Sequence, residues 1–271
     1  MSIASLFQKP FVVRSALIQL IRQANLGSYP FRLSIGAVPR PNYGYLVYNA
    51  ARLAHRLRYE RISVLEFGVA GGRGLLNLEY HVREVEKVVP VKIEIYGFDT
   101  GAGLPPPVDY RDLPYLWQQG FFRMDFEALS AKLQRAKLIL GDVAETAQSF
   151  FRDHDPAPIA AIIHDFDFYS STAAALRMFD QDEKYFLPRI YCYFDDITGT
   201  ETSLYNDYTG ERLAIREFNE TRPSKKLSPA YHLLARKLVQ PWYHQIFIYH
   251  DFRHARYNEF VSEEAQQIPV G

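Results

Sequence analysis

The chain has 271 residues, 48% of them apolar, which is enough for one α/β domain with a large core. Its 31 lysines and arginines balance its 31 aspartates and glutamates, so no net charge draws it to nucleic acid or to an anionic membrane. The only cysteine, Cys192, excludes an internal disulfide and fits a reducing compartment.

The sequence carries no signal for a membrane or for secretion. No apolar run approaches the roughly 20 residues that a membrane helix needs. The first segment, Met1 to Leu20, is interrupted by Lys9, Pro10 and Arg14 and lacks a basic start. We therefore expect a cytoplasmic protein whose partner is a small molecule.

Two helices are expected in the N-terminal part. Apolar positions at helical spacing predict a helix from Pro10 to about Leu26, suited to packing or to dimer formation, and another from about Tyr43 to Leu57. The segment between them, Pro30 to Pro41, is expected to be irregular. We assign residues 1–58 to a helical extension that packs on the domain or covers the substrate, and residues 59–271 to the main domain.

Three tyrosines, Tyr43, Tyr45 and Tyr48, lie at the start of the second of these helices. Aromatic residues at helical spacing often pack in a core, and they also line substrate pockets. Both interpretations stay open for this cluster.

A glycine-rich stretch follows the apolar segment that begins at Ile62. The β-branched opening predicts a buried parallel strand, the glycines a tight loop, and the run from Leu75 to Val85 a helix. The acid and glycines are Glu66, Gly68, Gly72 and Gly74. Glycine allows sharp bends and a close approach of a ligand to the backbone, although many α/β domains have such a turn. A dinucleotide fingerprint would place glycine at Ala70, so its absence argues against an oxidoreductase.

The next strand, Val91 to Asp99, ends in an acid. A carboxylate at this position in α/β folds accepts the hydroxyls of a ribose, so Asp99 is a candidate ribose ligand. The alternative is an ordinary turn aspartate before Thr100 and Gly101. The loop from Gly101 to Pro107 contains three prolines, which forbid a helix interior, and it is a candidate wall of the active site.

A helix from Phe126 to Arg135 and a short strand from Lys137 to Leu140 are expected next. The strand enters the pair Gly141-Asp142. In such a fold the acid after this strand can accept the amino group of an adenine, so Asp142 is a candidate cofactor ligand. A Gly-Asp pair is equally typical of a simple turn.

Two strands are each followed by a pair of acids. The strand Ile159–His164 precedes Asp165 and Asp167, and the strand Arg189–Phe194 precedes Asp195 and Asp196. A helix from Thr172 to about Glu183 joins these strands, which makes them parallel and brings both pairs to the carboxyl edge of the sheet.

Neighbouring strands lie about 5 Å apart, so the four carboxylates are expected within a few ångströms of one another. Like charges at that distance disfavour ionisation, so some carboxyls stay protonated or a divalent cation is present. Ligands that are all oxygen favour Mg²⁺, Ca²⁺ or Mn²⁺ over zinc.

The last part of the chain is expected to close the sheet. Residues Gly210 to Phe218 predict a helix, and two strands are expected near Leu234–Val239 and Tyr243–Tyr249. The segment Arg222–Pro229 is polar and lysine-rich, typical of a solvated surface loop, with a lid as the less favoured alternative.

These motifs resemble known enzymes. The pattern of Glu66 and the three glycines resembles motif I of class I S-adenosylmethionine (SAM) methyltransferases. Five motifs occur in the order found in macrocin O-methyltransferase-like enzymes: Glu66-Phe67-Gly68-Val69; Gly97-Phe98-Asp99-Thr100 with Gly103-Leu104-Pro105; Asp165-x-Asp167-x-Tyr169-x-Ser171-Thr172; Phe194-Asp195-Asp196; and Gly210-x-Arg212-x-Ala214-Ile215-x-Glu217-Phe218. They span about residues 62 to 218.

The resemblance implies a Rossmann-like class I methyltransferase fold, with a mostly parallel seven-stranded sheet and helices on both faces. It implies SAM and Mg²⁺ as cofactors and a hydroxyl of a sugar or natural product as acceptor, and a homo-oligomer is compatible with it. It implies that Asp165, Asp195 and Asp196 ligate the metal and that Asp167 is the general base. Residues Glu66, Gly68, Gly72, Gly74, Asp99 and Asp142 would bind the cofactor.

The chain departs from the family pattern in two places. Leu187-Pro188-Arg189-Ile190 stands where the family usually has a Gly-Gly turn, and Ser170 replaces a frequent glutamate. An alternative to an enzyme is therefore a SAM-binding subunit of the same fold that regulates or assembles other proteins without catalysing methyl transfer.

Overall fold

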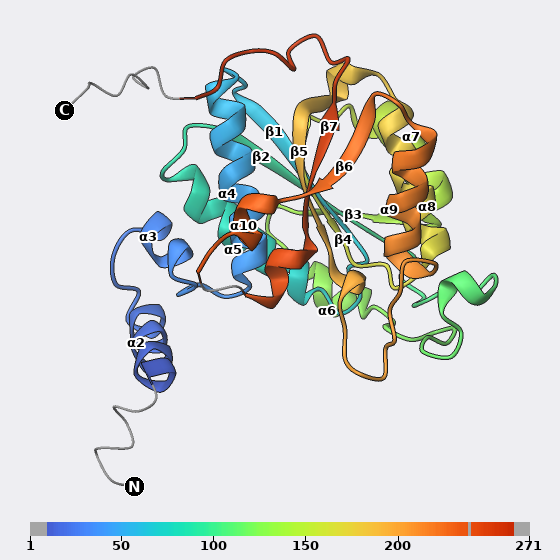
Figure 1. Cartoon of the computed structure of the whole chain (residues 1–271), viewed down its shortest axis with the longest axis horizontal. Helices are drawn as coiled ribbons and strands as arrows, with labels where there is room; N and C mark the ends of the chain where they lie inside the picture. The colour runs from blue at the N-terminus through green and yellow to red at the C-terminus, as the bar shows by residue number, and fades with distance from the viewer. Residues whose placement is uncertain (1–9, 238–239, 263–271) are drawn as a thin grey trace, which may run out of the picture.

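A seven-stranded sheet runs through the middle of the computed structural model, which describes residues 10–237 and 240–262 (Figure 1). The strand order is β3-β2-β1-β4-β5-β7-β6, and β7 alone runs antiparallel to its neighbours β5 and β6. The strands are β1 Arg61–Phe67, β2 Lys92–Asp99, β3 Lys137–Leu140, β4 Ile159–His164, β5 Phe186–Phe194, β6 Lys225–Pro229 and β7 Ile246–Asp251. The predicted fold class, a mostly parallel seven-stranded sheet, is confirmed.

Helices cover both faces of this sheet (Figure 1). On one face lie α4 and α5, and on the other α7, α8 and α9. The helices are α2 Pro10–Gln23, α3 Tyr29–Ser34, α4 Pro41–Arg56, α5 Arg73–Glu86, α6 Phe126–Ser130, α7 Val143–His154, α8 Tyr169–Leu176, α9 Gly210–Thr221 and α10 Tyr231–Leu234, with 3₁₀ turns at Tyr110–Asp112, Arg177–Asp180, Glu183–Tyr185, Asp195–Ile197 and Pro241–Gln245. Among the described residues, no helix has the length and apolarity that crossing a bilayer requires.

The central strands are buried because both of their faces are covered. Every residue of β4 is buried, and β1 is buried except for Arg61 at its start. This agrees with continuous apolar sequences, since a parallel strand between two helical layers presents no face to water. The carboxyl ends of β1 and β4, where the connections leave in opposite directions, form the point at which such sheets bind ligands.

The N-terminal part contributes to this core. Helix α4 packs on β1, β4 and β5, with Leu46, Ala50 and Ala54 fully buried. Helix α2 projects from the body (Figure 1), and α3 forms inside the segment expected to be irregular, where Ser28 caps its first turn. The proposed boundary at residue 58 stays a prediction.

The prediction for the C-terminal strands was partly wrong. Strand β6 lies at Lys225–Pro229, inside the segment expected to be a solvated loop, while Leu234 belongs to α10 and residues 235–237 form no strand. Positions 238 and 239 lie outside the described residues. Strand β6 is at the edge of the sheet, and lysines such as Lys225 and Lys226 commonly protect exposed edges, so their polarity hid the strand.

Two predicted helices end early, and one strand starts early. Helix α6 stops at Ser130 rather than at Arg135, and α8 gives way after Leu176 to 3₁₀ turns. Strand β5 begins at Phe186 and contains Pro188. The ladder between β4 and β5 shifts register there, from Ile159↔Phe186 to Ala161↔Tyr191, so the proline is accommodated in an irregular stretch of the strand.

Candidate active site

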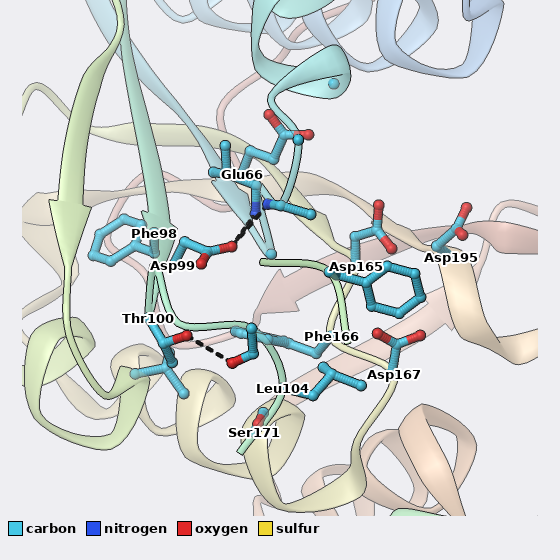
Figure 2. Close-up of a pocket in the computed structure, with 18 of the residues that line it drawn as sticks. Glu66, Phe98, Asp99, Thr100, Leu104, Asp165, Phe166, Asp167, Ser171 and Asp195 are labelled. Atoms are coloured by element: carbon cyan, nitrogen blue, oxygen red, sulfur yellow. Dashed lines mark hydrogen bonds between the residues drawn. The ribbon is translucent and has the colours of Figure 1, made fainter. Parts of the chain in front are cut away.

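A cavity of about 650 Å³ opens at the carboxyl ends of β1, β2, β4 and β5 (Figure 2). We call it the acidic cavity, because seven carboxylates and only two arginines line it: Glu66, Asp99, Asp142, Asp165, Asp167, Asp195 and Asp196, with Arg40 and Arg73. All of the site residues predicted from the sequence line this cavity except Gly72, which is the N-terminal cap of α5.

Asp99 fixes the glycine loop. One oxygen, Oδ2, accepts hydrogen bonds from the backbone N–H groups of Val69 (2.9 Å) and Ala70 (2.8 Å), and Oδ1 accepts one from Gly101 (2.6 Å). The turn interaction considered as the alternative is therefore present. The carboxylate also faces the cavity (Figure 2), so the proposed ribose contact stays a prediction, made by an acid that backbone amides already hold.

Gly68 is needed for contact within the protein. It has a φ of 81°, and a Cβ there would lie 1.7 Å from the carbonyl oxygen of Asp165. The loop after β1 and the end of β4 therefore meet backbone to backbone, which only glycine permits. We expected a ligand to make this close approach, and the structure shows that the neighbouring strand makes it.

Glu66 lies beneath the first turn of α5. It is 1% exposed, its Oε1 accepts a hydrogen bond from Tyr43 Oη at 2.8 Å, and a Cβ on Gly74 would lie 1.9 Å from the same oxygen. Its Oε2 is buried without a hydrogen-bond partner among the described residues. Burial raises the pKa of this carboxyl to about 7. Tyr43 thus packs in the core and orients Glu66, whereas Tyr45 and Tyr48 line a different cavity.

Asp142 is the N-terminal cap of α7, where its Oδ1 accepts a hydrogen bond from the N–H of Ala144 at 2.8 Å. Asp142 therefore has a local role in the turn before α7, as in the alternative considered from the sequence. Its position in the cavity wall leaves the contact with adenine as a prediction.

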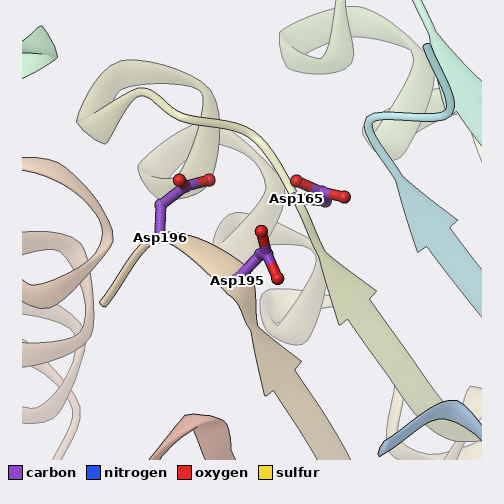
Figure 3. Close-up of side chains that lie close together, drawn as sticks. All are labelled: Asp165, Asp195 and Asp196. Carbon is purple, nitrogen blue, oxygen red and sulfur yellow. The ribbon is translucent and has the colours of Figure 1, made fainter. Parts of the chain in front are cut away.

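Three carboxylates gather between the ends of β4 and β5 (Figure 3). One oxygen each of Asp165, Asp195 and Asp196 lies within 4.8 Å of the other two. Figure 3 shows Asp165 at the end of one strand and the two other aspartates at the end of its neighbour. The predicted convergence of the two acidic pairs is therefore present, with Asp167 nearby in the wall of the same cavity.

The acids of this cluster are held by specific partners. Asp196 accepts hydrogen bonds from Tyr205 Oη (2.8 Å) and from the N–H of Asp167 (3.0 Å), while its own N–H donates to Glu211 (2.8 Å). Tyr193 donates to Asp195. Tyr193, Tyr205 and Glu211 were not identified from the sequence, because no motif singles out their side chains, even though Tyr193 lies only two residues before Asp195.

Burial and mutual repulsion disfavour ionisation of these carboxyls. Burial and the nearby Asp195 raise the pKa of Asp165 well above its usual range, burial and Asp196 raise that of Asp167 to about 9, and burial raises that of Asp196 to about 6. Glu211, fully buried, also has a raised pKa, and its Oε1 has no hydrogen-bond partner within the described part of the chain. The donor set, oxygen only and short of positive charge, is of the kind that hard divalent cations occupy.

Asp167 adopts an unusual backbone conformation. It has a φ of 62°, which L-residues other than asparagine and aspartate seldom adopt, and its side chain is 7% exposed. Non-glycine residues in this region cluster at functional sites, where the surrounding fold holds them in place.

The connection from β2 to α6 forms one wall of the cavity through Leu104, Trp117 and Phe122. It includes the Gly101–Pro107 loop that was predicted to form such a wall. The N–H of Leu104 donates to the carbonyl of Phe121, and that of Gly120 donates back to Leu104, each at 2.8 Å. The two ends of this wall are thus tied together.

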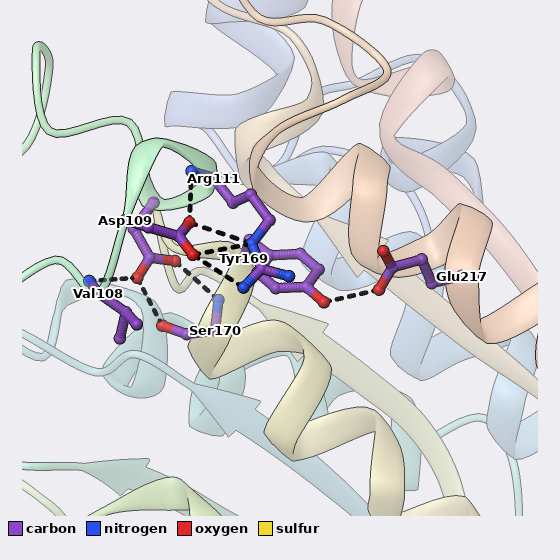
Figure 4. A network of polar contacts seen from close by, with 7 residues as sticks. Val108, Asp109, Arg111, Tyr169, Ser170 and Glu217 are labelled. Atoms are coloured by element: carbon purple, nitrogen blue, oxygen red, sulfur yellow. Dashed lines mark hydrogen bonds and ion pairs between the residues drawn. The ribbon is translucent and has the colours of Figure 1, made fainter.

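This connection is fastened to α8 and α9 through polar contacts (Figure 4). The buried carboxylate of Asp112 accepts hydrogen bonds from the N–H (2.8 Å) and Oγ (2.9 Å) of Ser170. Arg111 lies over the ring of Tyr169, whose hydroxyl donates to Glu217 at 2.6 Å. Ser170, a departure from the family pattern, therefore has a defined structural partner.

Arg40 brings a positive charge from the N-terminal part to the acidic cavity. It precedes α4 with a φ of 38°, lines the cavity and lies over the ring of Tyr43 at 5.1 Å. Its charge acts on Glu66 and Asp165. We missed it because a single arginine before a helix has no distinctive pattern.

No protein-family model matches the chain, and no curated protein matches it in sequence. Among solved structures, CalS11, described as a calicheamicin methyltransferase, superposes with a TM-score of 0.51 at 21% identity, covering 88% of this chain and 91% of that one. Apo CalS11, described as a TDP-rhamnose 3'-O-methyltransferase, superposes with a TM-score of 0.44 at 20% identity, covering 88% of this chain and 92% of that one. The O-methyltransferase TomG from Streptomyces achromogenes, in complex with SAM, superposes with a TM-score of 0.43 at 15% identity, covering 91% of this chain and 94% of that one. The protein thus has the class I methyltransferase fold of CalS11.

Proposed function

We propose that this protein is a SAM-dependent O-methyltransferase that acts on a hydroxyl of a sugar or natural product and uses a hard divalent cation. The observation that carries this proposal is the cluster of Asp165, Asp195 and Asp196, within 4.8 Å of one another, beside a glycine-loop cavity at the switch point of the sheet. CalS11, whose fold this protein shares, is a methyltransferase named for a natural product.

The glycine loop and two acids would hold the donor. Asp99 anchors the loop and faces the cavity, and Asp142, which caps the N-terminus of α7 in the cavity wall, would accept the adenine amino group. A cavity of about 650 Å³ is in the size range of ligand pockets. Bound SAM supplies an electrophilic methyl group on a positively charged sulfur. The surplus of carboxylates in the walls favours that charge.

The three clustered aspartates fit a hard divalent cation, because all three offer carboxylate oxygens and the raised pKa values of Asp165 and Asp196 show that negative charge there lacks compensation. A cation in this position would polarise the acceptor hydroxyl and lower its pKa. Tyr193, Tyr205 and Glu211 orient the aspartates from behind.

In this proposal Asp167 would serve as general base. It lines the same cavity, and its backbone N–H donates to Asp196, which fixes its backbone relative to the cluster. In a site that carries additional positive charge the pKa of Asp167 falls, and the carboxylate can accept the proton of the acceptor hydroxyl. Alignment of acceptor, methyl and sulfur by the rigid strand ends would supply much of the acceleration, up to about 7–11 kcal/mol in ideal cases.

Methyl transfer from labelled SAM to a panel of sugars and phenols, with and without EDTA, tests the proposal. We expect turnover that EDTA removes and Mg²⁺ restores. The Asp165→Asn and Asp196→Asn variants should lose that stimulation while calorimetry shows unchanged SAM binding. Unchanged rates in both variants would remove the metal from the proposal.

The same experiments address the alternatives. SAM binding with no transfer to any acceptor would favour the SAM-binding subunit, which the departures at Pro188 and Ser170 suggested. Binding of NAD without binding of SAM would overturn the proposal entirely.

A further inference from the structure

A second cavity, of about 500 Å³, lies between α2, α3, the first half of α4 and the connection from β6 to β7. We call it the basic cavity. Three arginines line it, namely Arg14, Arg52 and Arg236, and no aspartate or glutamate does. Cavities with only positive side chains concentrate the field of those charges and attract anions.

The arginines of the basic cavity are not neutralised by any carboxylate in the described part of the chain. None of the three forms an ion pair with a carboxylate within residues 10–237 and 240–262. Arg52 lies over the ring of Tyr48 at 5.6 Å, and Arg236 lies over that of Tyr243 at 5.3 Å and donates to its hydroxyl at 3.2 Å. The guanidinium groups of Arg52 and Arg236 are thus oriented by aromatic rings and keep donors for a ligand, which suits the paired oxygens of a phosphate.

Aromatic rings form one part of the wall, namely those of Tyr45, Tyr48, Trp242 and Tyr243. Trp242 lies 5.5 Å from the ring of Tyr45 and 4.4 Å from that of Tyr243. The hydroxyl of Tyr45 is hydrogen-bonded to His232 at 2.6 Å, which fixes that ring. Such rings provide flat surfaces on which a heteroaromatic base stacks. Asn49, at the cavity wall, donates from Nδ2 to the carbonyl of Tyr45 at 2.8 Å, so its amide oxygen would be the acceptor for a base edge.

We infer that the basic cavity binds a nucleoside diphosphate, with the phosphates at the arginines and the base against the aromatic wall. The two kinds of side chain match the two halves of this ligand, and the volume suits a molecule of that size. A long nucleic acid or a membrane surface would need an extended basic face, whereas this site is a concave cavity lined by three arginines.

This site is separate from the acidic cavity. The two lie on either side of the start of α4, where Arg40 lines the acidic cavity and the next residue, Pro41, lines the basic one. The inference therefore does not rest on methyl transfer, and either proposal can fail while the other holds.

Calorimetry on the full chain tests the inference. ADP, GDP and UDP are titrated in the presence of saturating SAM, which blocks binding of an adenosine in the other cavity. We expect at least one of them to bind with a stoichiometry of one, and at least tenfold more tightly than either pyrophosphate or the matching nucleoside. The affinity should fall with rising salt, because phosphate recognition by arginine is screened.

Variants locate the site. Arg52→Gln and Arg236→Gln should each weaken binding of that nucleotide at least tenfold. Trp242→Leu should lower the affinity for the nucleotide and leave the affinity for pyrophosphate unchanged. Arg22→Gln is the matched control, since Arg22 is exposed on α2, the helix that carries Arg14. Melting temperature and SAM affinity report that each variant is folded.

Three results would overturn the inference. No nucleotide binds more tightly than pyrophosphate; or SAM displaces the nucleotide, which would place it in the acidic cavity; or folded Arg52→Gln and Arg236→Gln bind it as the parent protein does. Unaltered binding in Arg22→Gln together with losses in the other variants supports it.

Discussion

The two cavities on either side of α4 are opposite in charge. Seven carboxylates and two arginines line the acidic cavity, while three arginines and no carboxylate line the basic one. The chain as a whole is neutral. A balanced net charge therefore says nothing about local fields, which the fold separates into regions of opposite sign within one domain.

The cavities also differ in how they are built. The acidic cavity is formed around the ends of four strands, whose hydrogen-bonded register fixes the positions of Asp99, Asp165 and Asp195. The basic cavity is formed by helices and by the connection around Trp242. Sites on strands hold groups more precisely than sites on connections, which suits chemistry in the first cavity and binding in the second.

The largest predicted effect is a loss of catalysis in the acidic cavity. Asp167→Asn should lower the turnover number about 10²- to 10⁴-fold, because it removes the group that accepts the proton. Asparagine tolerates the φ of 62°, so the fold should persist. Initial rates and SAM titrations measure the two effects, with the exposed Asp153→Asn as control. A rate within threefold of the parent protein would show that Asp167 is not the base.

The shape of the acidic cavity can be tested by two glycines of one loop. Gly68→Ala should cost about 3 kcal/mol or more of unfolding free energy, since its Cβ would collide with the carbonyl of Asp165 at a positive φ. Gly71→Ala should change it by less than about 0.5 kcal/mol, because nothing lies within 4 Å of the added atom. Urea denaturation compares them, and equal losses would contradict the tight approach of β1 and β4.

The stability of the protein should fall in acid because of His81 on α5, which is hydrogen-bonded to the segment before α4. This histidine is buried, its ring nitrogens are hydrogen-bonded with Tyr29 Oη (2.8 Å) and the carbonyl of Pro39 (2.9 Å), and burial lowers its pKa to about 4. In the unfolded state His81 takes up a proton near pH 6.5, whereas in the folded state it does so only near pH 4. The unfolding free energy is therefore highest above pH 6.5 and falls as the pH drops toward 4.

Between pH 7.5 and 4.5 we expect the parent protein to lose roughly 2–3 kcal/mol more unfolding free energy than His81→Gln. Urea denaturation at both pH values gives this difference. The same loss in both proteins would show that His81 has the same pKa in the folded and the unfolded state.

The smallest effect is the stabilisation by a cation. Mg²⁺ at about ten times its dissociation constant should add about 1.4 kcal/mol to the unfolding free energy. Asp165→Asn should abolish this gain, and NaCl of matched ionic strength should not produce it. Thermal melts at pH 7.5 measure the shift, and an equal gain in the variant would place the cation elsewhere.

Local sequence determined the central part of the fold. The apolar runs of β1 and β4, the glycine loop and the acids at the strand ends follow from rules that act over a few residues, and topology brings parallel strand ends to one edge. Hence the convergence of Asp165, Asp195 and Asp196 was predictable before the structure was known. Edge strand β6 was not predictable, because lysines that protect an exposed edge do not produce the apolar pattern of a core strand.

Only the tertiary structure decided what surrounds those acids. Arg40 comes from a segment far from Asp165 in the chain, and no spacing rule links Tyr205 and Glu211, which lie 9 and 15 residues after Asp196, to that acid. The raised pKa values, the close approach at a single glycine and the basic cavity all depend on burial and on distances through space. Sequence patterns encode neighbours along the chain, whereas these properties arise from packing.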